Sequence, residues 1–421
     1  MESLAEIKQQ LANEDAKVRI DALLDAWSYG KAGIELVIEA LQDKNRKVRQ
    51  SARLLLLESD EEIAAQALWN HLSFKKMQCL HTIIDFEVDY YNRVHDPNYF
   101  GIADYNNTLV GHWNLGYSSS KMAIWSLESG NFQQTSDSLT AHDFELGKQG
   151  KIFATTFEDI ILPAQNLETQ AFINRESNRK IVMQGIEPMG FAICKTDKPL
   201  VAIAESKHLI NFEPKRIVRQ QGKLEIWDYE KYICLLQNKF EDLYLNPDIY
   251  KLNNSKINPK YFGTSPLIFS PDGCTLIARF TDKNQQCLIK IWDTKKLELI
   301  QTIENLPKLI ITSVGVSPDK TLIACGIREE RVSVWELQCD RIIYSVNEVS
   351  PCILSTDGRV LIYATNRNKI VVRDLIAQRN LCTLQGHNAP VAYLALSEDR
   401  EFIASYSIDK QIKIWAIPNF S

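Results

Sequence analysis

The spacing of hydrophobic residues divides the chain into two parts. Over roughly the first seventy residues, apolar side chains recur at every third or fourth position, which is the period of an amphipathic helix. From about Met77 onward the period changes to two, and short apolar runs alternate with turn residues, which is the pattern of β-strands. We therefore expect a helical domain at residues 1–74 and an all-β domain at residues 75–421.

The helical part contains an internal repeat with an offset of 30 residues. Each unit predicts a helix, a polar turn and a second helix that carries the motif Val-Arg-x-x-Ala. This pattern resembles the short HEAT-like repeats of the phycobilisome-lyase type, and the resemblance implies a short α-solenoid. The aligned positions are Leu4 with Ile34, Ile7 with Val37, Leu11 with Leu41, Lys17-Val18-Arg19 with Lys47-Val48-Arg49, and Ala22 with Ala52.

A second repeat runs through the β part. Four turn tetrapeptides are each followed by an apolar strand and then, about twenty residues later, by an alternating strand. A period of about 40 residues with this order of strands and turns resembles the WD-repeat family. The resemblance is strongest over residues 262–418 and implies a β-propeller whose repeats supply four-stranded blades. The turns begin at Ser270, Ser317, Ser355 and Ser397, and the alternating strands contain Trp292, Trp335, Arg373 and Trp415.

Weaker matches upstream extend the propeller. Third strands are expected around Trp125, Pro163 and Trp227, which together with the four later ones predicts seven blades. The early units diverge from the family pattern, so six and eight blades are the alternatives. The residues after Trp415 are too few to complete the last blade, and an open sheet edge invites aggregation. Residues 78–84 resemble a fourth strand, so we expect them to pair with the last blade and close the ring. The expected fold is thus α plus all-β, with a short α-solenoid followed by a seven-bladed β-propeller.

The last repeat contains a set of polar residues typical of WD-repeat blades. The dipeptide Gly386-His387 opens this repeat, and an aspartate lies upstream of its tryptophan. The resemblance implies a hydrogen-bonded tetrad in which the carboxylate orients the imidazole, the imidazole bonds a hydroxyl, and the hydroxyl accepts the indole N–H. Each buried polar group is then satisfied, which is a structural role. The tetrad residues are His387, Ser405 or Ser407, Asp409 and Trp415.

Composition and charge exclude several classes of protein. The chain holds 48 Lys and Arg against 53 Asp and Glu, a net charge of −5, which argues against nonspecific binding to nucleic acid or to an anionic membrane. No apolar run reaches the roughly 20 residues of a membrane-spanning helix, and the acidic start does not resemble a secretory signal. Most of the nine cysteines lie in apolar runs, without a Cys-x-x-Cys pair, as expected of free thiols in a reducing compartment. We expect a cytoplasmic protein.

The sequence contains none of the motifs of common enzymes. There is no Walker A sequence, no dinucleotide-binding Gly-x-Gly-x-x-Gly, no His-Glu-x-x-His and no Gly-x-Ser-x-Gly. The seven histidines are not spaced as metal ligands. We therefore predict no catalytic residues, no cofactor and no metal site, and expect that the chain is not an enzyme.

Candidate contact residues lie where propeller turns reach the surface. The turn between the second and third strands of a blade is on a face where the family commonly docks partners, and Arg and Tyr are frequent in protein interfaces. The alternatives are that the arginines are ordinary exposed side chains, that Tyr406 packs between blades, and that the loop 240–262 folds onto its own blades. Two stretches, residues 205–221 and 240–262, exceed a normal connection, as functional or mobile loops often do. The candidates are Phe280, Arg328, Arg367 and Tyr406 near these turns, and Tyr244 and Tyr250 in the second long stretch.

The helical repeats offer a second surface. Arg19 and Arg49 occupy equivalent positions, and we expect each to pair with a nearby Asp or Glu. The densest basic cluster, from Lys44 to Arg53, is a candidate site for an anion or a partner, with a solvated helix face as the alternative.

Two functions follow from these patterns. The favoured one is a non-enzymatic scaffold that binds other proteins through two docking surfaces, one on the helical repeats and one on the propeller. The partners' identity and the oligomeric state are not predicted. The alternative is a subunit or chaperone of an enzyme system, such as phycobilin lyase-like pigment handling. A bilin absorbance band on the purified protein would favour the alternative, whereas capture of a defined polypeptide without a small molecule would favour the scaffold.

Overall fold

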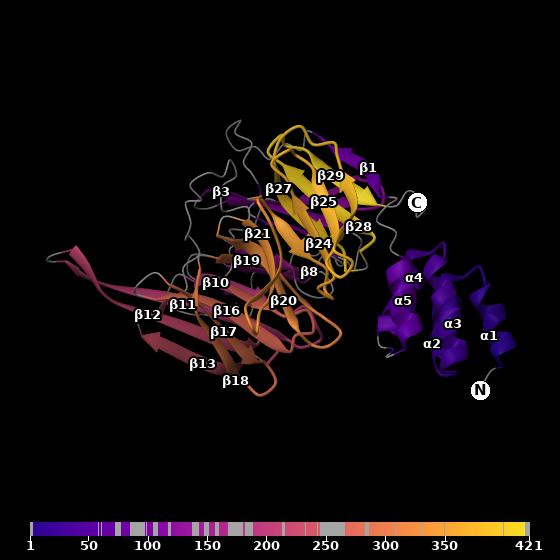
Figure 1. Ribbon diagram of the computed structural model, residues 1–421, viewed down its shortest axis with the longest axis horizontal. Helices are drawn as coiled ribbons and strands as arrows, with labels where there is room; N and C mark the ends of the chain where they lie inside the picture. Colours follow the sequence, from indigo (N-terminus) through magenta and orange to yellow (C-terminus); the bar gives the residue numbers. More distant parts are fainter. Residues whose placement is uncertain are drawn as a thin grey trace. The chain divides into compact units, whose positions relative to one another are not determined.

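The computed structural model describes two compact units (Figure 1). The helical unit consists of Met1–Gln78, Asp399–Phe402 and Ala416–Ser421, and the β unit of Cys79–Glu398 and Ile403–Trp415. The residues described are 3–57, 59, 61–71, 77–84, 97, 99–103, 108–116, 119–136, 143–146, 151–155, 160–166, 180–181, 188–212, 215–231, 233–241, 243–244, 266–282, 286–307, 309–329, 331–348, 350–398 and 400–416.

The N-terminal residues form helices, as their period predicts. Ser3 starts the first helix with a capping box, in which its hydroxyl accepts from the Glu6 N–H and the Glu6 carboxylate accepts from the Ser3 N–H. A Cβ at Gly33 would lie 1.8 Å from the carbonyl oxygen of Ala26, so glycine is needed for the third helix to approach the second. The helices are α1 (Leu4–Leu11), α2 (Ala16–Trp27), α3 (Lys31–Glu39), the 3-10 helix η1 (Ala40–Gln42), α4 (Arg46–Leu57) and α5 (Glu62–His71).

The apolar stripes of these helices form one core. Residues at equivalent positions of the 30-residue repeat are buried together, which shows that both units use the same helix face. The core includes Ile7, Ala22, Leu23, Val37, Leu41, Val48, Ala52 and Leu56.

The rest of the described chain forms seven sheets, six with four strands and one with five. The first sheet along the chain contains β2 (Tyr99–Ala103), β3 (Thr108–Gly116), β4 (Ser119–Ser126) and β5 (Phe132–Ser136). The second contains β6 (Asp143–Leu146), β7 (Lys151–Thr155), β8 (Ile160–Asn166) and β9 (Lys180–Ile181). The third contains β10 (Pro188–Ile193), β11 (Leu200–Phe212), β12 (Lys215–Asp228) and β13 (Ile233–Glu241).

The later sheets correspond to the stronger sequence repeats. The fourth sheet contains β14 (Leu243–Tyr244), β15 (Leu267–Phe269), β16 (Thr275–Asp282), β17 (Cys287–Asp293) and β18 (Glu298–Leu306), and the fifth contains β19 (Leu309–Val316), β20 (Leu322–Arg328), β21 (Arg331–Glu336) and β22 (Arg341–Val346). The sixth contains β23 (Cys352–Leu354), β24 (Val360–Ala364), β25 (Ile370–Asp374) and β26 (Arg379–Leu384). The last contains β27 (Val391–Leu396), β28 (Phe402–Ser407) and β29 (Ile412–Ala416) together with β1 (Gln78–Ile83).

Each sheet contributes one strand that contacts a similar strand in the sheet before it and in the sheet after it. Along the chain, β2 contacts β6, β6 contacts β10, β10 contacts β15, β15 contacts β19, β19 contacts β23 and β23 contacts β27. Strand β27 also contacts β2, so the contacts run from the last of these strands back to the first.

The outer strand of the final sheet comes from far upstream in the sequence. Its strand order is β1, β29, β28, β27, so the segment 78–83 covers the edge of β29. Lys413 on β29 donates from Nζ to the Thr82 hydroxyl on β1 at 2.9 Å. The edge that the C-terminal strand would otherwise expose is therefore occupied.

The turn tetrapeptides are held by their own side chains. The Ser270 hydroxyl donates to Asp272 Oδ1 at 2.6 Å, and Ser355 donates to Asp357 at 2.6 Å. The last residue of every tetrapeptide has a positive φ, which glycine adopts freely and other residues adopt at a cost. Those residues are Gly273 (62°), Lys320 (65°), Gly358 (69°) and Arg400 (60°).

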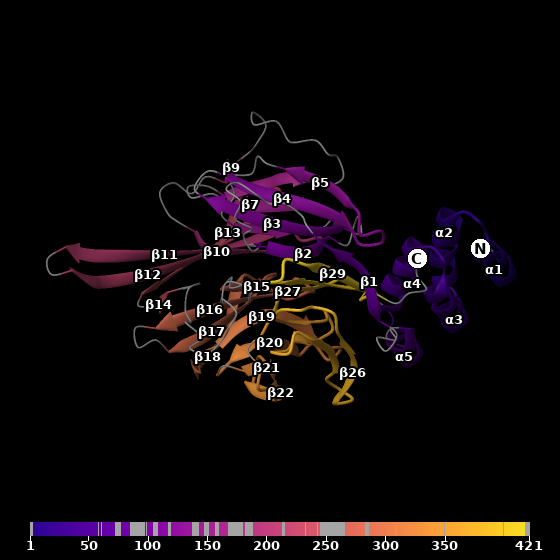
Figure 2. The same cartoon turned by 90° about the horizontal axis from the view of Figure 1, so that it is seen from above.

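The stretch 205–221, expected to be a long connection, is instead regular β-structure. Strand β11 has 13 residues and β12 has 14, and they pair from Leu200 opposite Asp228 to Phe212 opposite Lys215, with a shift of register between Leu209 and Ile210. In Figures 1 and 2 these two strands run beyond their neighbours in the sheet to a tip of their own.

The second long stretch is described only at its start. Tyr244 lies in β14, opposite Thr281 of β16, whereas Tyr250 and most of residues 240–262 lie outside the described residues. Among the helices in the described ranges, none is both long enough and apolar enough to cross a membrane.

Candidate interaction surfaces

The last sheet contains a buried hydrogen-bond network built from two strands, the connection before β27 and the turn after β28. The Trp415 indole donates from Nε1 to the Ser405 hydroxyl at 2.9 Å, and Ser405 Oγ lies 2.7 Å from His387 Nε2. Asp409 accepts from the backbone N–H groups of Asn388 and Gln411, at 3.0 and 3.1 Å. The structure thus brings together three of the four residues of the tetrad directly, with Asp409 beside them.

The two serines left open by the sequence have different roles. Ser405 is fully buried and joins the imidazole to the indole. Ser407 donates instead to the backbone oxygen of Ala389 at 3.0 Å. Because the Ser405 oxygen accepts the indole proton, its own proton goes to His387 Nε2, which leaves the Nδ1 proton facing Asp409.

Electrostatics keep this histidine neutral. Burial lowers the pKa of His387 to about 4, against the opposing attraction of the Asp409 carboxylate. His387 Nδ1 lies 3.7 Å from Asp409 Oδ1, which is too long for a hydrogen bond and leaves the burial effect larger. The neutral imidazole is therefore held by its contact with the Ser405 hydroxyl, with the Asp409 carboxylate nearby.

Two aromatic candidates for partner binding are buried, so this prediction is corrected for both. Phe280 is fully buried against Phe240, with ring centroids 4.8 Å apart. Tyr406 is also fully buried, between Phe100 and Tyr393. Both residues belong to second strands, β16 and β28, and not to the turns that follow, which is why their rings pack inward.

The candidate arginines separate into one buried and one exposed residue. Arg328 is 8 % exposed and pairs with the Asp340 carboxylate, with Nη2 to Oδ2 at 2.9 Å, so it too is corrected to an internal role. Its guanidinium lies 5.8 Å from the centre of the Trp335 ring. Arg367 is exposed in the turn between β24 and β25. Of these four turn candidates, only Arg367 presents its side chain to solvent.

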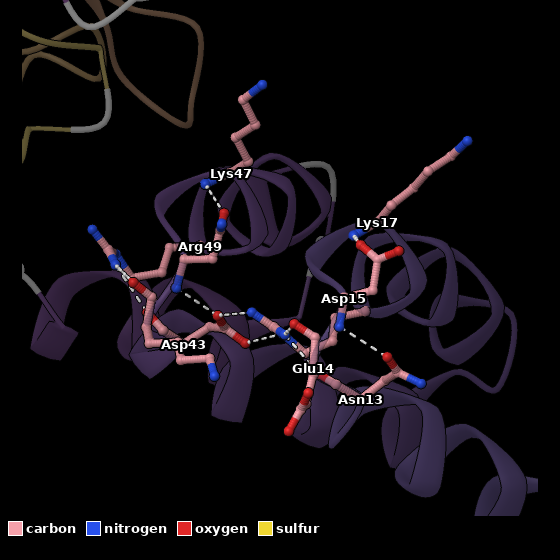
Figure 3. A network of polar contacts seen from close by, with 10 residues as sticks. Asn13, Glu14, Asp15, Lys17, Asp43, Lys47 and Arg49 are labelled. Atoms are coloured by element: carbon pink, nitrogen blue, oxygen red, sulfur yellow. Dashed lines mark hydrogen bonds and ion pairs between the residues drawn. The ribbon is translucent and has the colours of Figure 1, made fainter.

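The helical unit uses its repeated arginines internally. Figure 3 shows Arg49 and Asp43 in the polar network between the two repeat turns. Arg19 makes two hydrogen bonds to the Asp43 carboxylate, at 2.7 and 2.8 Å, and donates to the backbone oxygens of Asn13 and Glu14. This bidentate geometry ties the first repeat to the turn of the second.

Arg49 repeats this arrangement with a carboxylate from a distant segment. It donates to the backbone oxygens of Asp43 and Lys44, as Arg19 does one repeat earlier. A shift of 30 residues would place its carboxylate at Ser73, which has none. Glu401 supplies it, with two hydrogen bonds from Arg49 at 2.8 and 3.0 Å. Sequence reasoning missed Glu401, because it is 352 residues away and no local motif marks it.

The basic cluster of the second repeat is not one continuous patch. Arg46, Arg49 and Arg53 are buried, and Arg46 lies 3.3 Å from Glu401 Oε2 and 5.1 Å from the centre of the Phe402 ring. Only Lys44 and Lys47 of this cluster reach solvent. In the described ranges, no three His, Cys, Asp or Glu side chains are grouped so that they could hold a metal ion.

Comparison with known families decides what kind of repeat the last sheet is. Residues 378–416 match the family model described as "WD domain, G-beta repeat". This chain contains a WD repeat. The match spans β26 to β29 and includes His387, Ser405, Asp409 and Trp415. The repeat that matches the family model is therefore the same one that contains the buried hydrogen-bond network described above.

Curated relatives support a WD-repeat protein. Over 146 residues the chain is 25 % identical to "Protein SPA1-RELATED 3" of Arabidopsis thaliana, covering 33 % of this chain and 17 % of that protein. Over 118 residues it is 27 % identical to "WD repeat-containing protein 90" of Homo sapiens, covering 27 % of this chain and 7 % of that protein. The matches thus span much less than two thirds of these relatives' own length.

Solved structures show the same fold at low sequence identity. A chain in the "Crystal Structure of Mitotic Checkpoint Complex" superposes with a TM-score of 0.51 at 13 % identity, covering 81 % of this chain and 92 % of that one. The "Structure of the Neurospora crassa Pan2 WD40 domain" gives a TM-score of 0.53 at 11 % identity, covering 82 % and 96 %. The repeated four-stranded sheets of this WD-repeat protein are therefore those of a β-propeller.

Proposed function

We propose that this protein is a non-enzymatic scaffold with two docking surfaces, one on its helical repeats and one on its propeller. The observation that carries the proposal is the WD-repeat propeller itself, since repeated sheets present many turns on a rigid frame and such frames commonly bind proteins. The other partners considered, a membrane surface and nucleic acid, are disfavoured by the net charge of −5.

The proposed architecture is a helical domain at residues 1–74 and a seven-bladed propeller at residues 75–421. Seven sheets, the cyclic contacts of their first strands and the place of β1 beside β29 support a closed ring. The equivalent use of Arg19 and Arg49 supports HEAT-like repeats in a short solenoid. All nine cysteines are free thiols, which supports a cytoplasmic location.

Exposed basic residues lie on each part of the protein that we propose as a docking surface. On the propeller, Arg367 extends from the turn after β24. On the helical repeats, Lys17 and Lys47 are exposed at equivalent positions of the first turns of α2 and α4, and Figure 3 shows both side chains pointing out of the network.

Cross-linking of the full-length protein tests the scaffold directly. The tagged protein is captured from cells with a lysine-reactive cross-linker, and cross-linked peptides are identified by mass spectrometry. We expect one or a few polypeptides to link reproducibly to Lys17, Lys44 or Lys47, and to Lys369 beside Arg367. A matched Arg367→Glu variant should lose propeller cross-links and keep helical ones. A protein that links to no polypeptide in stoichiometric amount would contradict the proposal.

Pigment handling is the competing function, and it rests on the resemblance of the helical repeats alone. It predicts a visible absorbance band on the purified protein or after mixing with a bilin. A colourless protein that retains a polypeptide partner would leave the scaffold as the function.

A further inference from the structure

Three consecutive sheets of the propeller expose large aliphatic side chains where the third strand turns into the outer strand. Each of these side chains is between 45 and 70 % exposed, although the residues around them belong to well-packed sheets. Single exposed apolar residues are common on protein surfaces, whereas a group of them indicates an interaction site. The residues are Leu299 and Ile300 in β18, Ile342 in β22, and Ile376 in the turn before β26.

The turns that carry these residues share one backbone conformation. Each turn contains a residue with a positive φ just before the outer strand begins. Leu299 and Ile342 then occupy the same place in their outer strands, opposite Trp292 and Trp335 of the third strands. The repeat therefore brings the aliphatic side chains to equivalent sites of successive sheets. The residues with positive φ are Leu297 (60°), Asp340 (55°) and Gln378 (51°).

Side-chain contacts join the outer parts of the three sheets. Gln301 in β18 donates from Nε2 to the backbone oxygen of Gln338, in the turn before β22. Arg373 of the sixth sheet lies with its guanidinium 4.2 Å from the centre of the Tyr344 ring in β22. Figure 2 shows β18, β22 and β26 following one another along one edge of the β unit. We call this surface the outer rim and define it by Leu299, Ile300, Ile342 and Ile376.

The free charge on the outer rim is mostly positive. Lys295 and Arg379 are exposed, and neither forms an ion pair within the part of the chain that the structure describes. Glu298 is exposed beside them. The other acids of these turns are already engaged, because each accepts from backbone N–H groups of its own turn or pairs with an arginine. These engaged acids are Asp293, Glu336, Asp340 and Asp374.

The outer strands of these sheets do not offer a regular edge to a further strand. In each sheet the pairing of the third strand with the outer strand shifts register, which leaves one extra residue in the outer strand. Such bulges disfavour the addition of another strand. A partner on the outer rim is therefore held by side chains and not by backbone pairing. The extra residues are Ile300, Ile343 and Leu381.

We propose that the outer rim binds an acidic amphipathic helix of a partner protein. The apolar stripe of the helix packs across Ile300, Ile342 and Ile376, and its carboxylates face Lys295 and Arg379. A helix satisfies its own backbone hydrogen bonds and needs no strand edge. A second copy of the outer rim would instead bring like charges together. The inference rests on the proposed scaffold function and names one docking site within it.

Site-specific photo-cross-linking of the full-length protein tests this surface. A photoreactive benzoylphenylalanine replaces Ile300, and irradiation in cells links it to the chain that packs on the outer rim. We expect the linked peptide, identified by mass spectrometry, to come from one polypeptide, to contain more Asp and Glu than Lys and Arg, and to carry apolar residues at helical spacing. A link to a basic segment, or to a second copy of this protein, would overturn the proposal.

Substitutions separate the apolar from the charged contribution. With the photoreactive group at Ile300, the double variant Ile342→Thr/Ile376→Thr should lower the cross-linked yield about tenfold, because it removes exposed anchors and leaves the core intact. The double variant Lys295→Gln/Arg379→Gln should lower the yield about threefold at low salt and less at high salt, since exposed charges are screened.

The control removes an equally exposed leucine from the other unit. Leu24 of α2 is 58 % exposed, and Leu24→Gln should leave the yield unchanged. Equal melting temperatures of the variants establish that they fold. An unchanged yield in Ile342→Thr/Ile376→Thr would contradict docking on the outer rim. If Ile300 gives no link while lysine cross-linking still finds a partner elsewhere, this docking site is wrong and the scaffold function stands.

Discussion

The last two sheets of the propeller have the same four-stranded arrangement, but they differ at the position of the third strand where WD repeats commonly have a tryptophan. In the final sheet Trp415 is 2 % exposed and donates to Ser405. In the preceding sheet Arg373 takes this place, donates to the Asn380 side chain and the Gln378 backbone, and stacks 4.2 Å from the centre of the Tyr344 ring. The strand pattern therefore determines the sheet, and the buried tetrad stabilises one particular copy of it.

The largest difference in stability is expected when Trp415 and Arg373 are each replaced by alanine. Trp415→Ala removes a buried indole and leaves a cavity, so we expect the free energy of unfolding to fall by about 4 kcal/mol. Arg373→Ala removes a partly exposed side chain whose polar end is near the surface, so we expect about 1 kcal/mol. Urea unfolding of both variants measures the two values, and equal losses would show that the tetrad adds no stability.

The two serines of β28 sharpen the comparison within one strand. Ser405→Ala leaves the Trp415 N–H and the His387 nitrogen buried without their shared partner, which we expect to cost about 3 kcal/mol. Ser407→Ala removes two bonds to the backbone, one donated to the Ala389 oxygen at 3.0 Å and a weak one accepted from the Asp409 N–H at 3.3 Å, for which we expect about 1 kcal/mol. The reverse order would mean that Ser407 is the tetrad hydroxyl in solution.

The outer strands of the two sheets differ in origin. Strand β26 follows β25 directly, whereas β1 reaches β29 from the other end of the sequence. Deleting residues 1–84 should lower the stability of the propeller by about 3 kcal/mol more than deleting residues 1–74, because only the longer deletion removes the strand that covers β29. Calorimetry of the two truncated proteins gives the difference, and identical melting temperatures would contradict it.

The smallest effect is a pH dependence that the final sheet should show and the preceding sheet should not, since the preceding sheet contains no histidine. The pKa of His387 is lowered to about 4 in the fold by burial, with Asp409 and Lys413 as the charged neighbours, against about 6.5 when unfolded. Its stabilisation is therefore present above pH 6.5 and lost as the pH falls toward 4. Between pH 7 and pH 5 we expect a loss of about 2 kcal/mol.

His387→Gln isolates this contribution. Burial also lowers the pKa of His112 to about 4, so the wild type loses stability at both histidines over this range. The variant should lose about 2 kcal/mol less than the wild type between pH 7 and pH 5, measured by urea unfolding at each pH. A parallel pH dependence of the two proteins would show that His387 titrates normally in the fold.

Sequence periodicity predicted the fold where the signals are local. The turn tetrapeptides and the alternating strands after them lie within one repeat, so the β-propeller and its WD repeat follow from residues 262–418. The contact residues were harder to predict, because Phe280 and Tyr406 lie at the ends of second strands and pack inward. The length of β11 and β12 was missed because residues 205–221 are polar enough to resemble a loop.

The ion pair between distant segments left no motif in the sequence, in contrast to the strand at residues 78–84, which its resemblance to a fourth strand predicted. The carboxylate of Glu401 meets Arg49 across 352 residues, and neither residue stands in a motif that refers to the other. The 30-residue repeat gives one indirect sign of this ion pair. It aligns Asp43, whose carboxylate accepts from Arg19, with Ser73, so Arg49 has no carboxylate at the equivalent position.

This pairing makes the completion of the helical unit depend on a segment that is made much later. The helices around Arg49 leave the ribosome before Glu401, which neutralises the buried guanidinium of Arg49 and lies 352 residues further along the chain. During translation these helices lack that counter-ion, and a chain truncated by a premature stop codon before residue 401 would never acquire it. Quality-control proteases would then meet the structural defect far upstream of the lesion in the message.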